Sequence, residues 1–113
     1  MDMPVTVVVK DKYARTLAPL GDLEQVVDAA LQRYTIEQIA AKIVDLRQRD
    51  KAFQAKYNCD YETFVRRSSS DERFVARIEQ SVSKTWELDL AEWEFCHKGG
   101  QDWTQRLQEI LLG

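Results

Sequence analysis

The sequence predicts a mainly α-helical protein in which a single N-terminal β-strand precedes five or six helices, one of them long. Two observations support this fold class. Val5 to Val9 is a run of β-branched residues with one threonine, which is typical of a strand. From residue 11 onward the apolar residues recur at helical spacing, and no second strand pattern follows. One strand cannot satisfy its own backbone hydrogen bonds, so we expect it to pair with the same strand of a second copy, as an intersubunit ribbon.

Side chains alternate between two faces of the expected strand, residues 4–10. We assign one face to the dimer core: Val5, Val7 and Val9. The other face carries Thr6, Val8 and Lys10. A short helix over residues 11–17 should follow and end near Pro19, because proline does not continue a helix.

The next predicted element is the long helical region. Asp22 is placed to cap a helix over residues 23–34, with Gln25 as its capping-box partner. Thr35 either opens a new helix or lies within a continuing one. Seven positions then follow at alternating spacings of three and four: Ile36, Ile39, Ile43, Leu46, Asp50, Phe53 and Tyr57.

This heptad seam is compatible with two arrangements. It predicts either an ordinary amphipathic helix packed within one chain or a coiled coil between copies. In the second arrangement the seam contributes dimerisation residues Ile36, Ile39, Ile43 and Leu46. Asp50 would set the register of the seam or mark its end.

Four further helices are predicted after residue 57. Asp60 should cap a helix over residues 61–67, and Ser69 with Glu72 should cap one over residues 70–82. A helix over residues 85–97 should end at Gly99 and Gly100, before a last helix to residue 112.

The helix over residues 85–97 has two apolar sides. One side carries Trp86, Leu90, Trp93 and His97, and the opposite side carries Leu88, Ala91 and Phe95. A helix of this kind lies between two neighbours. One neighbour is expected to be the core of the chain itself. The second is another helix of the chain, a second subunit or a partner protein.

The composition describes a soluble globular chain of 113 residues, with 44% hydrophobic and 31% charged residues and a net charge of −3. Residues 1–57 hold nine Lys and Arg against eight Asp and Glu, whereas residues 58–113 hold seven against eleven. This acidity argues against non-specific nucleic-acid binding. No apolar run approaches the roughly 20 residues that span a bilayer, and no secretion signal is recognisable. We therefore expect a cytoplasmic protein that does not interact with membranes.

The residues that usually carry catalysis are sparse. Cys59, Cys96 and His97 are the only thiol and imidazole groups, and they lack the spacing of a zinc site. Cys96 and His97 would point about 100° apart on a helix, which does not suit a nucleophile–base pair. There is no glycine-rich phosphate loop. We expect no enzyme activity, no metal and no cofactor.

The N-terminal pattern resembles the ribbon-helix-helix family of DNA-binding proteins. The resemblance covers the strand, the short helix, the turn at Gly21 and Asp22, and the helix over residues 23–34. In that family the outward residues of the paired strands enter the major groove of DNA. The resemblance implies operator DNA as a partner, read by Thr6, Val8 and Lys10.

Residues 56–64, KYNCDYETF, and residues 91–94, AEWE, are similar to small prokaryotic antitoxins. The resemblance implies a dimerisation and DNA-binding region over residues 1–57 and an acidic, toxin-binding region over residues 58–113. The chain would neutralise a basic toxin by direct binding and repress its own operon. The implied partner-binding residues are Trp86, Glu87, Asp89, Glu92, Trp93, Glu94 and Trp103.

Two hypotheses from other classes compete with the antitoxin. One is a stand-alone helical scaffold or adaptor that forms homo-oligomers and binds neither DNA nor toxin. An ordered C-terminal half in the isolated chain would favour it. The other is a DNA-binding regulator without a toxin, which would depend on Thr6 and Lys10 for operator binding.

Overall fold

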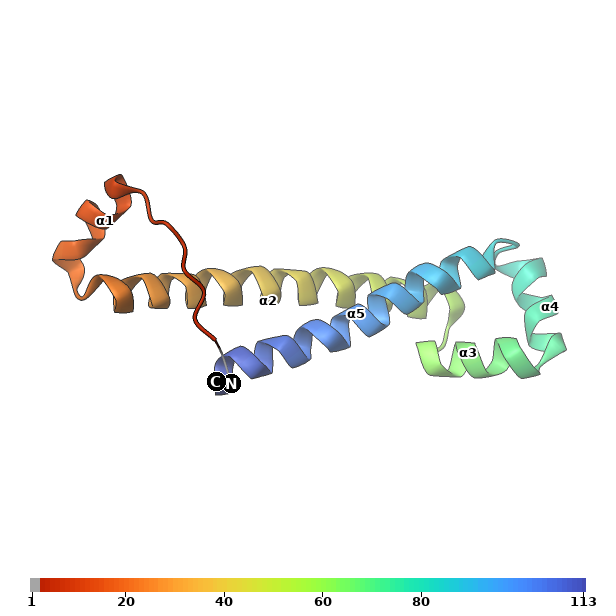
Figure 1. Cartoon of the computed structure of the whole chain (residues 1–113). Coiled ribbons are helices and arrows are strands. Elements are labelled where there is room, and N and C mark those ends of the chain that lie inside the picture. The colour runs from red at the N-terminus through yellow and green to blue at the C-terminus, as the bar shows by residue number, and fades with distance from the viewer. Residues whose placement is uncertain (1–2) are drawn as a thin grey trace. The chain divides into compact units, whose positions relative to one another are not determined.

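The chain is helical throughout its regular structure. A computed structural model describes residues 3–113 and shows five α-helices and one short 3₁₀ helix over them (Figure 1). In chain order these are α1 (Asp11–Leu17), η1 (Ala18–Leu20), α2 (Leu23–Tyr57), α3 (Tyr61–Ser70), α4 (Glu72–Ser81) and α5 (Trp86–Leu112). The mainly α character agrees with the sequence prediction, but three helices follow residue 57 where four were expected, because α5 is a second long helix of 27 residues.

The predicted N-terminal strand is wrong. The described residues contain no strand, and residues 3–10 have no regular secondary structure. Val5 and Val7 are 85% and 75% exposed, and Val9 is 40% exposed, so this set does not face a core. The preference of valine for strands reflects packing on a pleated, half-buried surface. Without a neighbouring strand or a packing surface, this preference does not produce a strand. The intersubunit ribbon is therefore not a feature of the fold.

Contacts divide the chain into two compact units, Met1–Thr35 and Ile36–Gly113, and α2 runs through both. We call them the N-terminal unit and the C-terminal unit. The division is structural, and the functional division expected after residue 57 stays a prediction.

No residue of the N-terminal unit is buried among those that the structure describes. The predicted local signals nevertheless operate. Helix α1 covers the expected residues, and Pro19 lies in the 3₁₀ turn that follows it. Gly21 has a φ of 151°, and Asp22 Oδ2 accepts a hydrogen bond from the Gln25 N–H at 3.3 Å, so Asp22 caps α2 as predicted. Short-range chemistry thus sets these helix ends in the absence of a core.

Helix α2 continues through Thr35 without a break for 35 residues. It ends at Tyr57 because Asn58 adopts a left-handed conformation with φ 55°. Asparagine tolerates this conformation better than other residues with a side chain, and a left-handed residue commonly terminates a helix.

Helix α3 begins where the sequence predicts, since Asp60 Oδ1 accepts from the Thr63 N–H at 2.7 Å. It extends to Ser70, three residues beyond the predicted end. The hydroxyls of Ser69 and Ser70 bond back to the Arg66 carbonyl oxygen at 3.0 and 2.7 Å, which allows the serine run to remain helical.

Helix α4 is capped by Asp71 and not by the expected Ser69. Asp71 Oδ1 accepts from the N–H groups of Arg73 and Phe74, each at 3.1 Å. An ionised carboxylate accepts these hydrogen bonds more strongly than a serine hydroxyl, so the helix starts after Asp71.

The predicted break at Gly99 and Gly100 is also wrong, because α5 passes through both glycines. A Cβ atom on Gly99 would lie 3.2 Å from Leu46 Cδ1, closer than an ordinary contact. The absence of a side chain therefore lets α5 approach α2 at Leu46. This tertiary contact outweighs the low helix propensity of glycine.

We expect Gly100→Ala to stabilise the C-terminal unit by about 0.5–1 kcal/mol. Glycine inside a helix costs roughly this much relative to alanine. A Cβ atom at Gly100 would meet only Leu46 Cβ, at an ordinary 4.0 Å. Urea unfolding of both proteins measures the difference. Gly99→Ala is the matched variant, and its gain should be smaller because of the closer contact; an equal gain would contradict this account.

The core of the C-terminal unit lies where α5 packs along the second half of α2, with α3 and α4 at one end (Figure 1). Ile39, Ile43 and Leu46 are buried at 5–6% exposure, and Leu46 packs against Gly99 of α5. The heptad seam is thus satisfied within one chain, as the first of its two predicted arrangements required. Three of the four seam residues assigned to a dimer are already covered.

An aromatic cluster closes the end of the unit at α3 and α4. Its buried members are the aromatic residues Tyr57, Phe64, Phe74 and Trp93, together with the aliphatic Ile78. They come from α2, α3, α4 and α5, so the four helices share one core. The C-terminal unit is therefore folded around its own hydrophobic interior.

Candidate functional site

The three tryptophans predicted to bind a partner lie in different environments. Trp93 is completely buried and belongs to the core. Its ring lies 5.7 Å from Phe53, 5.8 Å from Tyr57 and 5.3 Å from Phe64. A side chain in this position supports the fold and cannot reach a partner.

Trp86 is half-buried and is also directed inward. Its Nε1–H donates to Glu79 Oε1 at 3.1 Å, and its ring packs edge-on against Phe64 at 6.1 Å. Trp86 therefore links α5 to α4 and the core.

Trp103 is the tryptophan that keeps an open side. It lines a hollow of about 330 Å³ together with Gln38, Ile39, Ala41, Lys42 and Asp45. Lys42 Nζ lies 5.5 Å from the centre of its ring, and the Arg106 guanidinium lies 4.6 Å away. We call this feature the Trp103 hollow.

The acidic residues predicted to contact a basic partner are mostly engaged within the chain. Asp89 Oδ2 accepts from Lys56 Nζ at 2.6 Å and from the Tyr57 hydroxyl at 2.5 Å. Glu92 pairs with Arg49 at 2.9 Å, and Glu94 pairs with Lys98 at 2.6 Å.

Glu87 alone of the four acids has no ion pair among the described residues and is exposed. Burial by itself raises the pKa of Asp89, but the bonds from Lys56 and Tyr57 outweigh it and hold that pKa below its usual range. This helix therefore presents less free negative charge than its sequence indicates.

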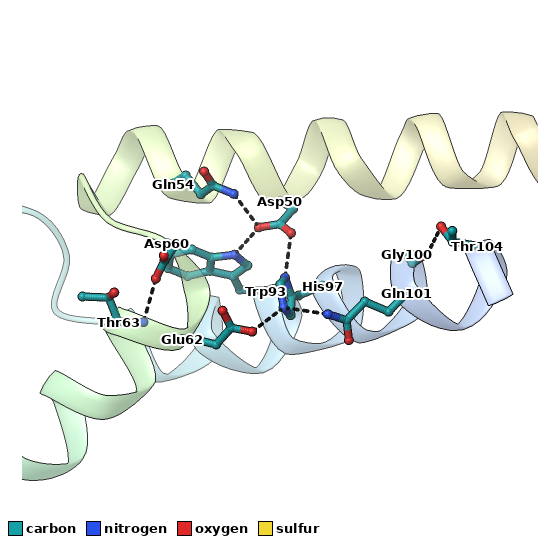
Figure 2. A network of polar contacts seen from close by, with 10 residues as sticks. All are labelled: Asp50, Gln54, Asp60, Glu62, Thr63, Trp93, His97, Gly100, Gln101 and Thr104. Carbon is teal, nitrogen blue, oxygen red and sulfur yellow. Dashed lines mark hydrogen bonds and ion pairs between the residues drawn. The ribbon is translucent and has the colours of Figure 1, made fainter.

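A polar network connects α2, α3 and α5 beside the aromatic core (Figure 2). Asp50 Oδ1 accepts from Trp93 Nε1 at 2.7 Å and from Gln54 at 3.2 Å, and Asp50 Oδ2 contacts His97 Nδ1 at 2.9 Å. On the other side of its ring, His97 Nε2 lies 3.3 Å from Glu62 Oε1. Asp50, which interrupts the seam in the sequence, is therefore the polar centre of the α2–α5 contact.

The surroundings of His97 determine its charge. Partial burial alone lowers its pKa, but the hydrogen bonds and negative charges of Asp50 and Glu62 outweigh burial and raise the pKa above 6.5. For Asp50, burial raises the pKa, and the bonds from His97, Trp93 and Gln54 outweigh it and lower the pKa. Both shifts favour an ion pair between His97 and Asp50 more strongly in the folded chain than in the unfolded chain.

We expect this unit to lose stability as the pH rises above about 6.5, the usual pKa of histidine. The raised pKa of His97 means that the folded state holds a proton more tightly than the unfolded state. The stabilisation is complete below the unfolded pKa of about 6.5 and is lost as the pH rises through the folded pKa. A single group changes stability by at most about 1.4 kcal/mol per pH unit. Urea unfolding across this range measures the slope, and His97→Gln should flatten it; an unchanged slope would show that another group is responsible.

The network lies beside Cys96, which precedes His97 in the sequence. The Asp50 carboxylate is occupied by three donors, and burial raises the pKa of the Cys96 thiol, which leaves it a poor nucleophile. Cys59 and Cys96 are both free, and burial also raises the pKa of Cys59. No group of three or more His, Cys, Asp or Glu among residues 3–113 could hold a metal ion.

The predicted DNA-reading residues do not lie on a strand. Thr6, Val8 and Lys10 lie in the exposed irregular segment over residues 3–10, and Val8 is 91% exposed. With the ribbon absent, the geometric basis for their assignment is lost.

Comparisons with known proteins add no identity. No family model, no curated protein and no solved structure matches this chain. Within the described part of the chain, no helix is both long and apolar enough to cross a membrane.

Sequence reasoning missed Glu62 and Gln54 as partners of the Asp50–His97 pair. Because α2 and α5 pack antiparallel, Asp50 in the α2 seam lies opposite the ring nitrogens of Trp93 and His97 on α5. A single acid in an apolar seam and a single histidine on an apolar face were the available signals, but the pairing of the two helices could not be inferred from them.

Proposed function

We propose that this chain is a non-catalytic binding protein that neutralises a toxin protein by covering it, as the resemblance to small prokaryotic antitoxins implies. The observation that supports the proposal is the contrast between the two units. The C-terminal unit encloses its own aromatic core, whereas the N-terminal unit buries no described residue. Large apolar side chains are therefore exposed in the N-terminal unit without a core beneath them. Contiguous exposed apolar surface marks a contact site for another molecule.

The exposed apolar residues of the N-terminal unit are numerous for its length. They are Met3, Val5, Val7, Val8, Val9, Tyr13, Leu20, Leu31 and Tyr34. Leu31 and Tyr34 are 60% and 62% exposed, three residues apart on α2. Such residues are neighbours on one face of a helix and can anchor a partner together. An N-terminal ribbon has no role in this binding. Apolar contacts of the N-terminal unit replace most of the charge complementarity that the sequence predicts for the acids of α5.

Co-purification tests this proposal directly. The tagged full-length chain is recovered from its host, and a stoichiometric partner identified by mass spectrometry is then expressed alone and together with the chain. We expect the partner alone to inhibit growth and the chain to restore it. Leu31→Glu combined with Tyr34→Glu should weaken partner recovery at least tenfold, whereas Gln32→Glu, on an exposed neighbouring position, should not. Recovery of the chain without any partner contradicts the proposal.

A second candidate is supported by a separate observation. The C-terminal unit is ordered around a complete core, as expected for a stand-alone helical scaffold that forms homodimers or higher homo-oligomers. Light scattering coupled to size-exclusion chromatography distinguishes the two functions. A stable homo-oligomer without other partners favours the scaffold, and a hetero-complex with a toxin favours the neutraliser.

A further inference from the structure

The Trp103 hollow is an open recess in the C-terminal unit. Its walls come from α2 and α5: Ile39 and Ala41 contribute aliphatic surface, and Trp103 contributes one face of its indole ring. The volume of about 330 Å³ lies near the lower end of the range for ligand pockets, roughly 300–1,000 Å³. An aliphatic side chain of a bound peptide is of suitable size and chemistry to fill it.

Three cations follow one flank of α2 at seven-residue intervals, namely Lys42, Arg49 and Lys56. Because a helix repeats its orientation almost completely every seven residues, the three lie on one side of α2. The second and third each face an acid of α5: Arg49 pairs with Glu92, and Lys56 pairs with Asp89. Lys42, at the first position, faces Trp103 and not a carboxylate.

The positive charge at the hollow is therefore not neutralised by an ion pair. Lys42 lines the hollow, lies over the Trp103 ring and is not within ion-pair distance of a carboxylate of the described residues. Arg106 lies against the same ring but does not line the hollow. Asp45 also lines the hollow, but it is associated with Arg49 at 3.7 Å. Asp102 and Glu109 line a separate recess with Arg106 without pairing to it. A carboxylate of a bound partner could pair with Lys42 in the way that Glu92 pairs with Arg49 and Asp89 pairs with Lys56.

We propose that the Trp103 hollow docks a segment of a partner protein that carries an aliphatic side chain next to a carboxylate. The aliphatic group fills the recess against Trp103, and the carboxylate lies beside Lys42. The inference rests on the proposed binding function and specifies a contact site and the chemistry of the partner there. It reverses the charge expected from the sequence, because Asp89, Glu92 and Glu94 of α5 pair within the chain whereas Lys42 does not.

Short peptides of defined chemistry test the hollow. The probe is N-acetyl-leucyl-glutamate amide, and its matched control is N-acetyl-leucyl-lysine amide. The readout is the indole N–H resonance of Trp103 in the full-length chain, assigned by its loss in Trp103→Phe. We expect the glutamate peptide to shift this resonance saturably, with an affinity at least tenfold higher than that of the lysine peptide.

Two charge variants make the test specific. Lys42→Glu should abolish the preference for the glutamate peptide, and Lys51→Glu should leave it intact because Lys51 does not line the hollow. Far-ultraviolet circular dichroism confirms that both variants remain helical. Equal binding of the two peptides, or no binding, overturns the proposal. A shift of the Trp103 resonance with protein concentration alone also overturns it, since a second copy would then occupy the hollow.

The outcome is separable from that of the proposed function. If a toxin is captured equally well by Lys42→Glu and by the unaltered chain, the neutraliser function stands and the docking site is wrong. If the peptide preference is found but no toxin is captured, the docking chemistry stands and the neutraliser function fails.

Discussion

Replacing Trp93 with alanine is expected to destabilise the C-terminal unit by about 3–5 kcal/mol, the usual cost of removing a large aromatic side chain from a core. Trp93 is completely buried and stacks with Phe53 and Tyr57, so its loss leaves a cavity at the junction of three helices. It also removes the indole N–H that donates to Asp50 at 2.7 Å. Since small domains are stable by only about 5–15 kcal/mol, the variant should unfold at much lower urea concentration or fail to fold.

Two matched variants separate the possible causes. Trp93→Phe keeps a ring in the core but removes the hydrogen bond, and its cost should be about 1–3 kcal/mol. Trp103→Ala removes a half-buried tryptophan from the same helix and should cost less than Trp93→Ala. Equal costs for Trp93→Ala and Trp103→Ala would show that Trp93 is not the centre of the core.

The second large effect is expected at Asp50. Asp50→Ala should cost about 2–4 kcal/mol, because a buried donor left without its acceptor costs about 1–3 kcal/mol and the charge-assisted bond to His97 is lost as well. The buried indole N–H of Trp93 has no other acceptor in the network. Thermal and urea unfolding followed by tryptophan fluorescence measure the loss, and the fluorescence should also report the altered surroundings of Trp93.

Asp45→Ala is the appropriate control for Asp50→Ala. Asp45 lies on the same helix, but its side chain is 66% exposed and its ion pair with Arg49 is long, at 3.7 Å. Exposed pairs of this kind contribute about 0–1 kcal/mol. If Asp45→Ala proved as costly as Asp50→Ala, the loss at Asp50 would reflect the helix in general and not the polar network.

The helices were predictable because their signals are local. Asp22 and Asp60 cap the helices expected of them, and the heptad spacing from Ile39 to Tyr57 marks the face of α2 that is buried. The sequence could not distinguish packing within the chain from packing between chains, since both require the same spacing. That distinction came from the continuity of α5, which passes through Gly99 and lies along the seam.

The failures also have physical causes. Val5, Val7 and Val9 have high strand propensity, but this propensity produces a strand only where a neighbouring strand or packing surface is present. The sequence predicts one partner-binding surface from the tryptophans and acids of α5. In the structure Trp93 is buried in the core, whereas Trp103 lines an open hollow. The angle at which two helices cross determines which aromatic residues are buried and which stay on the surface. This angle cannot be derived from a single sequence.

The single helix α2 begins in a unit in which none of the residues 3–35 is buried, and it ends in a unit with a complete core. Its two parts should therefore differ in lifetime under attack by a protease. Segments held by few buried contacts open readily, whereas a core opens only with global unfolding. Cleavage before Thr35 would remove the exposed apolar residues and leave a folded remnant. The binding capacity of the chain and the persistence of its fold would then decay at different rates.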